Sequence, residues 1–111
     1  RGDVAVYVCA TTVTTIHYLA TKAVGRARSR GLLERLLSLV EVAPVNRIVL
    51  DRALESKVAD YEDSVVCQSA LQVSADAVVT RNLGDYRKAP LPVHRPSDML
   101  KLLGARETPD P

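Results

Sequence analysis

Two acidic side chains stand at positions where carboxylates could hold a divalent cation. Asp63 belongs to the first turn of an expected helix and heads the stripe that continues at Val66, so it faces the body of the domain. Asp85 and Asn82 follow a short apolar segment in the string TRNLGDY. Two carboxylates that converge on Mg²⁺, which prefers hard oxygen ligands, would form a site for the hydrolysis of phosphodiesters.

Each of these residues also has a purely structural interpretation. Asp60 and Asp63 are spaced as in a capping box, and acidic side chains in a first helical turn complement the helix dipole. Asn82, Gly84 and Asp85 are residue types that favour turns. Taken one at a time, the spacings favour capping for Asp63 and a turn for Asp85 over a metal site.

Basic side chains lie close to these acids in the sequence, where they could meet phosphates or remain solvated surface charges. They are Arg81, Arg87, Lys88 and Arg95. The run GRARSR at residues 25–30 could also face a nucleic acid, although the solvated start of a helix is the favoured interpretation. His17 and His94 stand singly in apolar surroundings, which favours packing over metal binding.

Short apolar segments alternate with helical patterns, which predicts an α/β fold with a parallel sheet. We expect strands at residues 4–9, 41–45, 77–80 and 91–94, the first buried on both faces. We expect helices at residues 11–24, 26–40, 46–57, 61–74 and 96–103, with Thr11 or Thr12, Asn46, Asp60 and Ser97 as caps. Right-handed crossovers then bring residues 11–15, 60–63 and 80–85 to one rim, where open α/β sheets bind ligands.

Composition limits the classes of protein that fit. A chain of 111 residues with 47% hydrophobic and 25% charged residues predicts one globular domain rather than disorder, and no apolar run could span a bilayer. A net charge of +2 argues against a protein that only coats nucleic acid. The two cysteines, Cys9 and Cys67, show no metal-ligand spacing, so we expect small buried hydrophobes in a reducing, cytoplasmic setting.

Three strings together resemble a PIN domain, most closely the bacterial branch that includes VapC-like toxin ribonucleases. They are ATTVTTIHYLATKAVG at residues 10–25, DYEDSVVCQSA at residues 60–70 and ADAVVTRNLGDYRKAPLPVHRPSDML at residues 75–100. The resemblance covers residues 3–103. It implies a three-layer α/β/α domain with a parallel sheet, and RNA cleavage that depends on Mg²⁺ or Mn²⁺ held by a rim cluster of three or four acids.

The resemblance also assigns roles to individual residues. Asp63 and Asp85 match metal-binding acids of the family, with Asn82 and Thr80 in supporting positions. The family's Glu on the helix after its second strand falls at about Thr15, which could position a metal-bound water but carries no charge. The basic residues that become candidates for RNA contacts are Arg81, Arg87 and Lys88.

The family's first Asp lies at the end of an N-terminal strand, and this sequence is expected to begin just before the family's second strand. We therefore expect a partial PIN-like domain at residues 1–103, without the N-terminal strand and helices, and a flexible tail at residues 104–111. The absent strand would lie mid-sheet, beside residues 4–9 and 77–80.

The leading hypothesis is an endoribonuclease that serves as the toxin of a toxin–antitoxin pair, with RNA, an antitoxin protein and a second copy of itself as partners. The alternative is a non-catalytic PIN-like module that binds RNA or protein through a degenerate acidic site. An unrelated receiver-like signalling domain is a weaker third hypothesis, because the required acidic pair after the first strand cannot be placed.

Overall fold

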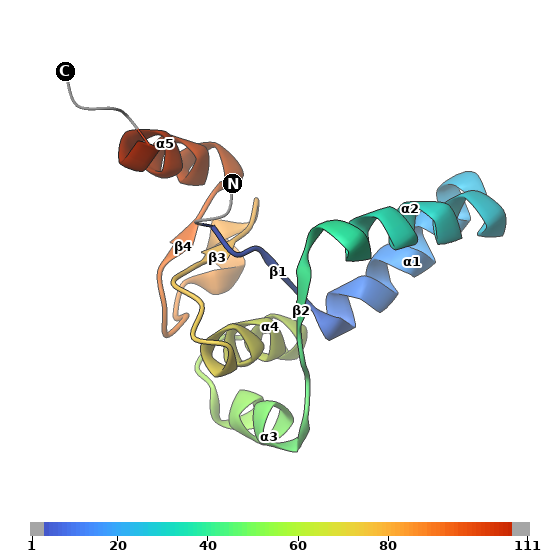
Figure 1. Cartoon of the computed structure of the whole chain (residues 1–111). Coiled ribbons are helices and arrows are strands. Elements are labelled where there is room, and N and C mark those ends of the chain that lie inside the picture. Colours follow the sequence, from blue (N-terminus) through green and yellow to red (C-terminus); the bar gives the residue numbers. More distant parts are fainter. Residues whose placement is uncertain (1–3, 108–111) are drawn as a thin grey trace.

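Helices and short strands alternate along the chain, as the apolar periodicity predicted (Figure 1). The computed structural model describes residues 4–107. In chain order the elements are β1 (Tyr7–Cys9), α1 (Ala10–Val24), α2 (Arg26–Leu39), β2 (Glu41–Ala43), α3 (Arg47–Glu55), α4 (Tyr61–Gln72), β3 (Val78–Val79), the 3-10 helix η1 (Leu83–Tyr86), β4 (Val93–His94) and α5 (Pro96–Glu107). No helix in this part of the chain is long and apolar enough to cross a membrane.

The strands pair in parallel, which confirms the predicted α/β class. β1 pairs with β2, where Tyr7 lies opposite Glu41, and β3 pairs with β4, where Val78 lies opposite Val93. Within the described residues these are two separate two-stranded sheets rather than one continuous sheet. β1 and β3 both line a pocket of about 640 Å³ that also touches Met99 of α5.

The expectation that residues 4–9 form a strand buried on both faces is wrong. The strand is limited to Tyr7–Cys9, Val6 is 55% exposed and Tyr7 is 41% exposed, and only Cys9 is buried. The physical reason is that β1 has β2 on one side and the pocket on the other, so its outward side chains have few neighbours. β3 shows the same pattern, with Val78 buried and Val79 largely exposed.

The core lies where α3 and α4 pack together and against β1. It contains Cys9, Val49, Ala53 and Val65. α4 contributes small buried side chains to the core, and the hydroxyls of Ser64 and Ser69 both have hydrogen-bond partners within the domain. Ser69 Oγ donates to the Pro44 carbonyl at 3.1 Å. This bond ties α4 to the end of β2.

Helix ends match the predicted caps in two places and differ in two others. Asn46 and Asp60 cap α3 and α4 with their side chains, as expected. The predicted cap at Thr11 or Thr12 is wrong, because α1 begins directly after Cys9 without a side-chain cap. The predicted cap at Ser97 is also wrong, because α5 begins at Pro96 and Ser97 lies in its first turn. α5 continues past the expected end at residue 103 to Glu107, so Gly104 does not end the helix. Residues 108–111 of the expected tail lie outside the described residues.

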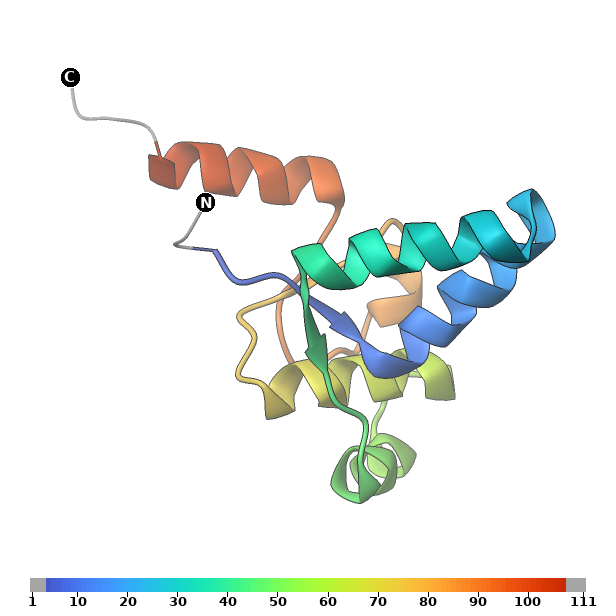
Figure 2. The ribbon, with the colours of Figure 1, turned by 45° about the vertical axis from the view of Figure 1, so that its right-hand side comes forward.

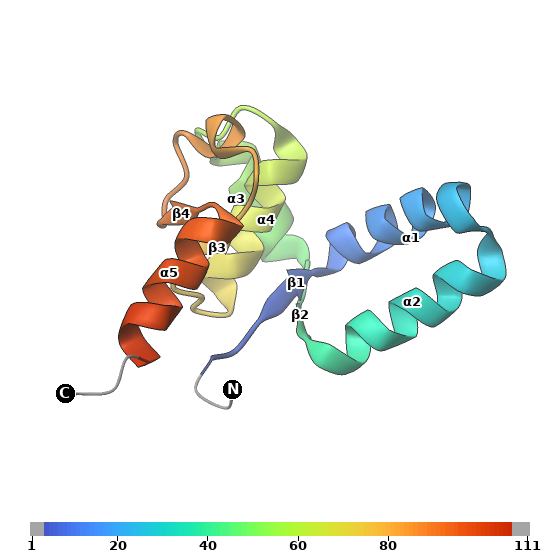
Figure 3. The same cartoon turned by 90° about the horizontal axis from the view of Figure 1, so that it is seen from above.

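α1 and α2 form a hairpin that projects from the rest of the domain. Figures 2 and 3 show the two helices side by side, with their connection at the end farthest from α3, α4 and α5. Gly25 makes the connection with φ = 86°, a left-handed value that favours glycine. No residue of α1 is fully buried, because its main helical neighbour is α2.

Candidate active site

The first turn of α4 positions Asp63. The Asp63 backbone N–H donates to Asp60 Oδ1 at 3.0 Å, so Asp60 is the capping side chain. The Asp63 side chain is half-buried and has a different partner, because Asp63 Oδ1 accepts a hydrogen bond from Tyr86 Oη at 3.0 Å. Capping therefore explains Asp60, while the carboxylate of Asp63 is bound to a residue 23 positions away.

The turn after β3 brings Tyr86 to this carboxylate, and Asp85 is the residue before Tyr86 in η1. The Asn82 N–H donates to Thr80 Oγ1 at 3.1 Å, and the Asp85 N–H donates to the Asn82 carbonyl at 3.0 Å. These local bonds bear out the turn interpretation of Asn82 and Asp85. The same bonds set the direction of η1, so that its last residue, Tyr86, reaches Asp63.

Burial and like charge make the Asp63 carboxylate unusually basic. Burial raises the pKa of Asp63 most, the hydrogen bond from Tyr86 lowers it, and the charges of Asp60, Asp85 and Glu62 raise it further. The net pKa lies above the ordinary value of aspartate. The negative charge of Asp85 thus contributes to the raised pKa of Asp63, and a bound cation would offset this repulsion.

Tyr86 and Cys67 are held in their neutral forms beside Asp63. Burial and the negative charge of Asp63 raise the pKa of Tyr86 far above its usual value, so its phenol remains a donor. Burial and the same charge raise the pKa of Cys67 to about 11. Cys67 is a protonated thiol near neutral pH, which makes it a packing residue and not a nucleophile.

The remaining candidate residues differ in their positions and in the hydrogen bonds that they make. Thr15 Oγ1 donates to the Thr11 carbonyl at 3.3 Å, so the Thr15 hydroxyl is engaged within α1. Asn82 contributes its backbone to the turn. The candidates for RNA contacts are exposed on and beside η1: Arg81, Arg87 and Lys88.

Tyr86 is the site residue that sequence reasoning missed. The available signal was an aromatic residue directly after Asp85 in the string LGDY, but spacing alone does not tell where its hydroxyl points.

The donors fit a weakly held Mg²⁺ or Mn²⁺. Among the described residues, no group of three or more His, Cys, Asp or Glu side chains could hold a metal ion. The pair Asp63 and Asp85 still offers the hard carboxylate oxygens that Mg²⁺ prefers. Mg²⁺ commonly binds through one or two carboxylates and keeps several waters.

A family model for the PIN domain matches residues 1–84. The chain belongs to the PIN domain family. PIN domains are generally nucleases, and Asp63 lies within the matched segment while Asp85 and Tyr86 directly follow it. No curated protein and no solved structure gave a match to the chain.

Proposed function

We propose that this PIN domain is a metal-dependent endoribonuclease that hydrolyses RNA phosphodiester bonds at Asp63 and Asp85. The observation that carries the proposal is the hydrogen bond from Tyr86 of η1 to Asp63 of α4, which joins the two acidic segments and lets the charge of Asp85 act on Asp63. Membership of a family of nucleases supports it.

Each residue has a separable task in this proposal. Asp63 and Asp85 would hold Mg²⁺ or Mn²⁺, and Tyr86 holds the Asp63 carboxylate in place through the hydrogen bond to Oδ1. When bound, such a cation stabilises charge on the phosphate and lowers the pKa of a water. The side chains that would position the RNA phosphates by charge are Arg81, Arg87 and Lys88.

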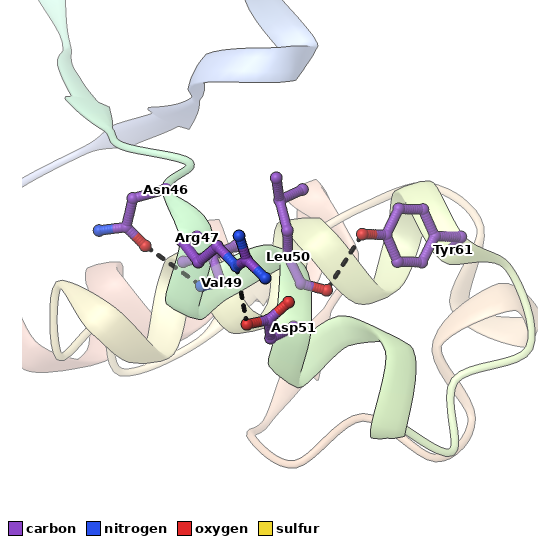
Figure 4. A network of polar contacts seen from close by, with 6 residues as sticks. All are labelled: Asn46, Arg47, Val49, Leu50, Asp51 and Tyr61. Atoms are coloured by element: carbon purple, nitrogen blue, oxygen red, sulfur yellow. Dashed lines mark hydrogen bonds and ion pairs between the residues drawn. The ribbon is translucent and has the colours of Figure 1, made fainter.

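The variant Asp63→Asn tests the catalytic assignment in the full-length protein. The amide keeps the size of the side chain and can still accept from Tyr86, but it removes the charge that a cation needs. We expect metal-dependent RNA cleavage to be abolished. The matched control is Asp51→Asn, because Asp51 is an exposed aspartate on α3 that contacts Arg47 at 3.3 Å (Figure 4). Cleavage that survives Asp63→Asn at the control's rate would overturn the assignment.

A second candidate function is a non-catalytic module that binds RNA or protein. Two observations favour it: Thr15, which stands where the family has a glutamate, carries no charge, and among the described residues no group of three or more His, Cys, Asp or Glu side chains could hold a metal ion. Calorimetric titration with Mg²⁺ separates the two functions. A nuclease should give a binding isotherm that Asp63→Asn removes, whereas a binding-only module should give none.

We further propose that the protein is the toxin of a toxin–antitoxin pair that can also form a homodimer. The support is the similarity of its strings to VapC-like toxins, and the buried free thiols of Cys9 and Cys67 fit a reducing cytoplasm. Expression should arrest growth, and co-expression of a small neighbouring reading frame should restore it. Growth arrest that persists in Asp63→Asn would contradict the link between toxicity and RNA cleavage.

A further inference from the structure

The α1–α2 hairpin carries positive charge that the proposed nuclease site does not use. Lys22 lies in the last turn of α1, and the first turns of α2 contain Arg26, Arg28 and Arg30. All four side chains are exposed. We call residues 22–30 the hairpin tip. From residue 4 to residue 33 the sequence contains no Asp or Glu, so no acid of either helix neutralises the tip before Glu34.

The hairpin tip is a well-formed feature of the fold. Thr21 Oγ1 and Ser29 Oγ lie 2.9 Å apart and share a hydrogen bond between α1 and α2. Ser29 is fully buried, and its Oγ also donates to the Arg26 carbonyl at 3.0 Å. These bonds hold the two helices together next to the turn at Gly25, so the arginines are presented from a defined surface.

Helix stability does not account for the sign of this charge. Arginines in the first turns of α2 face the positive end of the helix dipole, where cations are unfavourable, and no acidic residue stands in that turn. Lys22 alone is favourably placed, at the end of α1, where it also lies over the Tyr18 ring at 5.1 Å. The cluster is therefore suited to an external anion with repeated charges.

We propose that the hairpin tip binds the phosphate backbone of single-stranded RNA at a distance from Asp63 and Asp85. That the polyanion is RNA rests on the proposed nuclease function. α1 has 15 residues and is therefore about 22 Å long, and it begins next to the core residue Cys9. The tip thus contacts a separate stretch of a long RNA, which increases affinity without touching the reacting phosphate.

The test compares two triple variants of the full-length protein. Arg26→Gln/Arg28→Gln/Arg30→Gln neutralises the tip. The control makes the same change in charge at exposed positions outside the hairpin: Arg52→Gln/Lys57→Gln/Lys101→Gln. Binding of a long fluorescent single-stranded RNA is measured without divalent metal over a range of salt concentrations. The logarithm of the binding constant falls linearly with the logarithm of the salt concentration, and each lost phosphate contact should make this slope about 0.7 less negative. The slope of the tip variant should therefore be about 2 less negative than that of the wild type.

The proposal also predicts a kinetic pattern. With a long RNA, the tip variant should have a higher KM than the wild type and the same kcat. With a short RNA, which cannot reach the tip, the two proteins should cleave equally well. Equal losses in the tip and control variants would overturn the proposal, as would wild-type protein that does not bind RNA. A tip variant that no longer binds phosphatidylserine vesicles but binds RNA as tightly as the wild type would also overturn the proposal.

A photoreactive residue at exposed Ala27 in otherwise unaltered protein provides a second measurement that does not depend on the folding of the triple variant. It should crosslink to the bound RNA, and failure to crosslink under conditions of saturated binding would refute the contact. The nuclease proposal is judged separately, by cleavage in Asp63→Asn. If Asp63→Asn abolishes cleavage but the tip variant keeps the wild-type salt slope, the nuclease proposal stands and the proposal that the hairpin tip binds RNA is rejected.

Discussion

Removing the Tyr86 hydroxyl should weaken the site and shift its pH dependence toward alkaline values. In Tyr86→Phe, Asp63 Oδ1 loses the hydrogen bond that it accepts at 3.0 Å. This bond lowers the pKa of Asp63, while burial and the neighbouring acids raise it. Without this bond, Asp63 should stay protonated up to a higher pH than in the wild type. As the pH is lowered, metal binding and cleavage should therefore be lost earlier in Tyr86→Phe, at a higher pH than in the wild type.

The magnitude follows from the chemistry of the bond. A hydrogen bond to a charged group contributes about 1.5–3 kcal/mol, and the contact of Asp63 with solvent reduces this to about 1 kcal/mol. Loss of the bond should therefore raise the pKa of Asp63. The same loss corresponds to a fall in Tm of about 4–8 °C at neutral pH, by the scaling for a domain of about this size.

The stability that the Tyr86 hydrogen bond contributes depends on the protonation state of Asp63. The bond is strongest with the ionised carboxylate, so its stabilising effect is present above the pKa of Asp63 and weakens as the pH falls through it. The difference in unfolding free energy between wild type and Tyr86→Phe should therefore be larger at neutral pH than in acid. Denaturant unfolding at several pH values measures this difference.

Tyr61→Phe is the matched control. Tyr61 Oη donates at 3.0 Å to the Leu50 carbonyl, so the same substitution removes a tyrosine hydrogen bond of equal length from a neutral acceptor (Figure 4). NMR titration of the side-chain carboxyl carbons in metal-free protein should show a raised pKa for Asp63 in Tyr86→Phe only. If Asp63 titrates identically in wild type, Tyr86→Phe and Tyr61→Phe, the proposed role of Tyr86 at the site is refuted.

Three further changes have defined outcomes. Asp85→Asn should lower the pKa of Asp63 by removing one repelling charge, and an unchanged carboxyl titration would show that the two acids do not interact. Ser69→Ala leaves the Pro44 carbonyl without its 3.1 Å partner and should lower the free energy of unfolding by about 1–2 kcal/mol in denaturant titrations. Asn46→Ala removes the cap of α3 and should cost about 1 kcal/mol, whereas Asn46→Asp should retain most of the stability.

The amino-acid sequence alone predicts the α/β class, two of the helix caps and the family. Asn46 and Asp60 are caps because a side-chain acceptor ahead of a helical pattern has few other uses. Short β-branched runs between helices predicted parallel strands, and these are observed. The acidic and turn-forming strings around Asp63 and Asp85 indicated a PIN domain, which the family match over residues 1–84 bears out.

Only the tertiary structure shows which of these segments are buried and which side chains they contact. The apolar run at residues 4–9 predicted burial on both faces, yet Val6 is exposed because burial depends on a second strand or helix that periodicity does not report. The sequence predicts a helix at residues 11–24, but it does not show that α1 packs mainly on α2 and that none of its residues is fully buried. The bond from Tyr86 to Asp63 spans 23 residues and follows from the path of η1. A sequence pattern specifies the face that a side chain occupies, and only the fold specifies what that face meets.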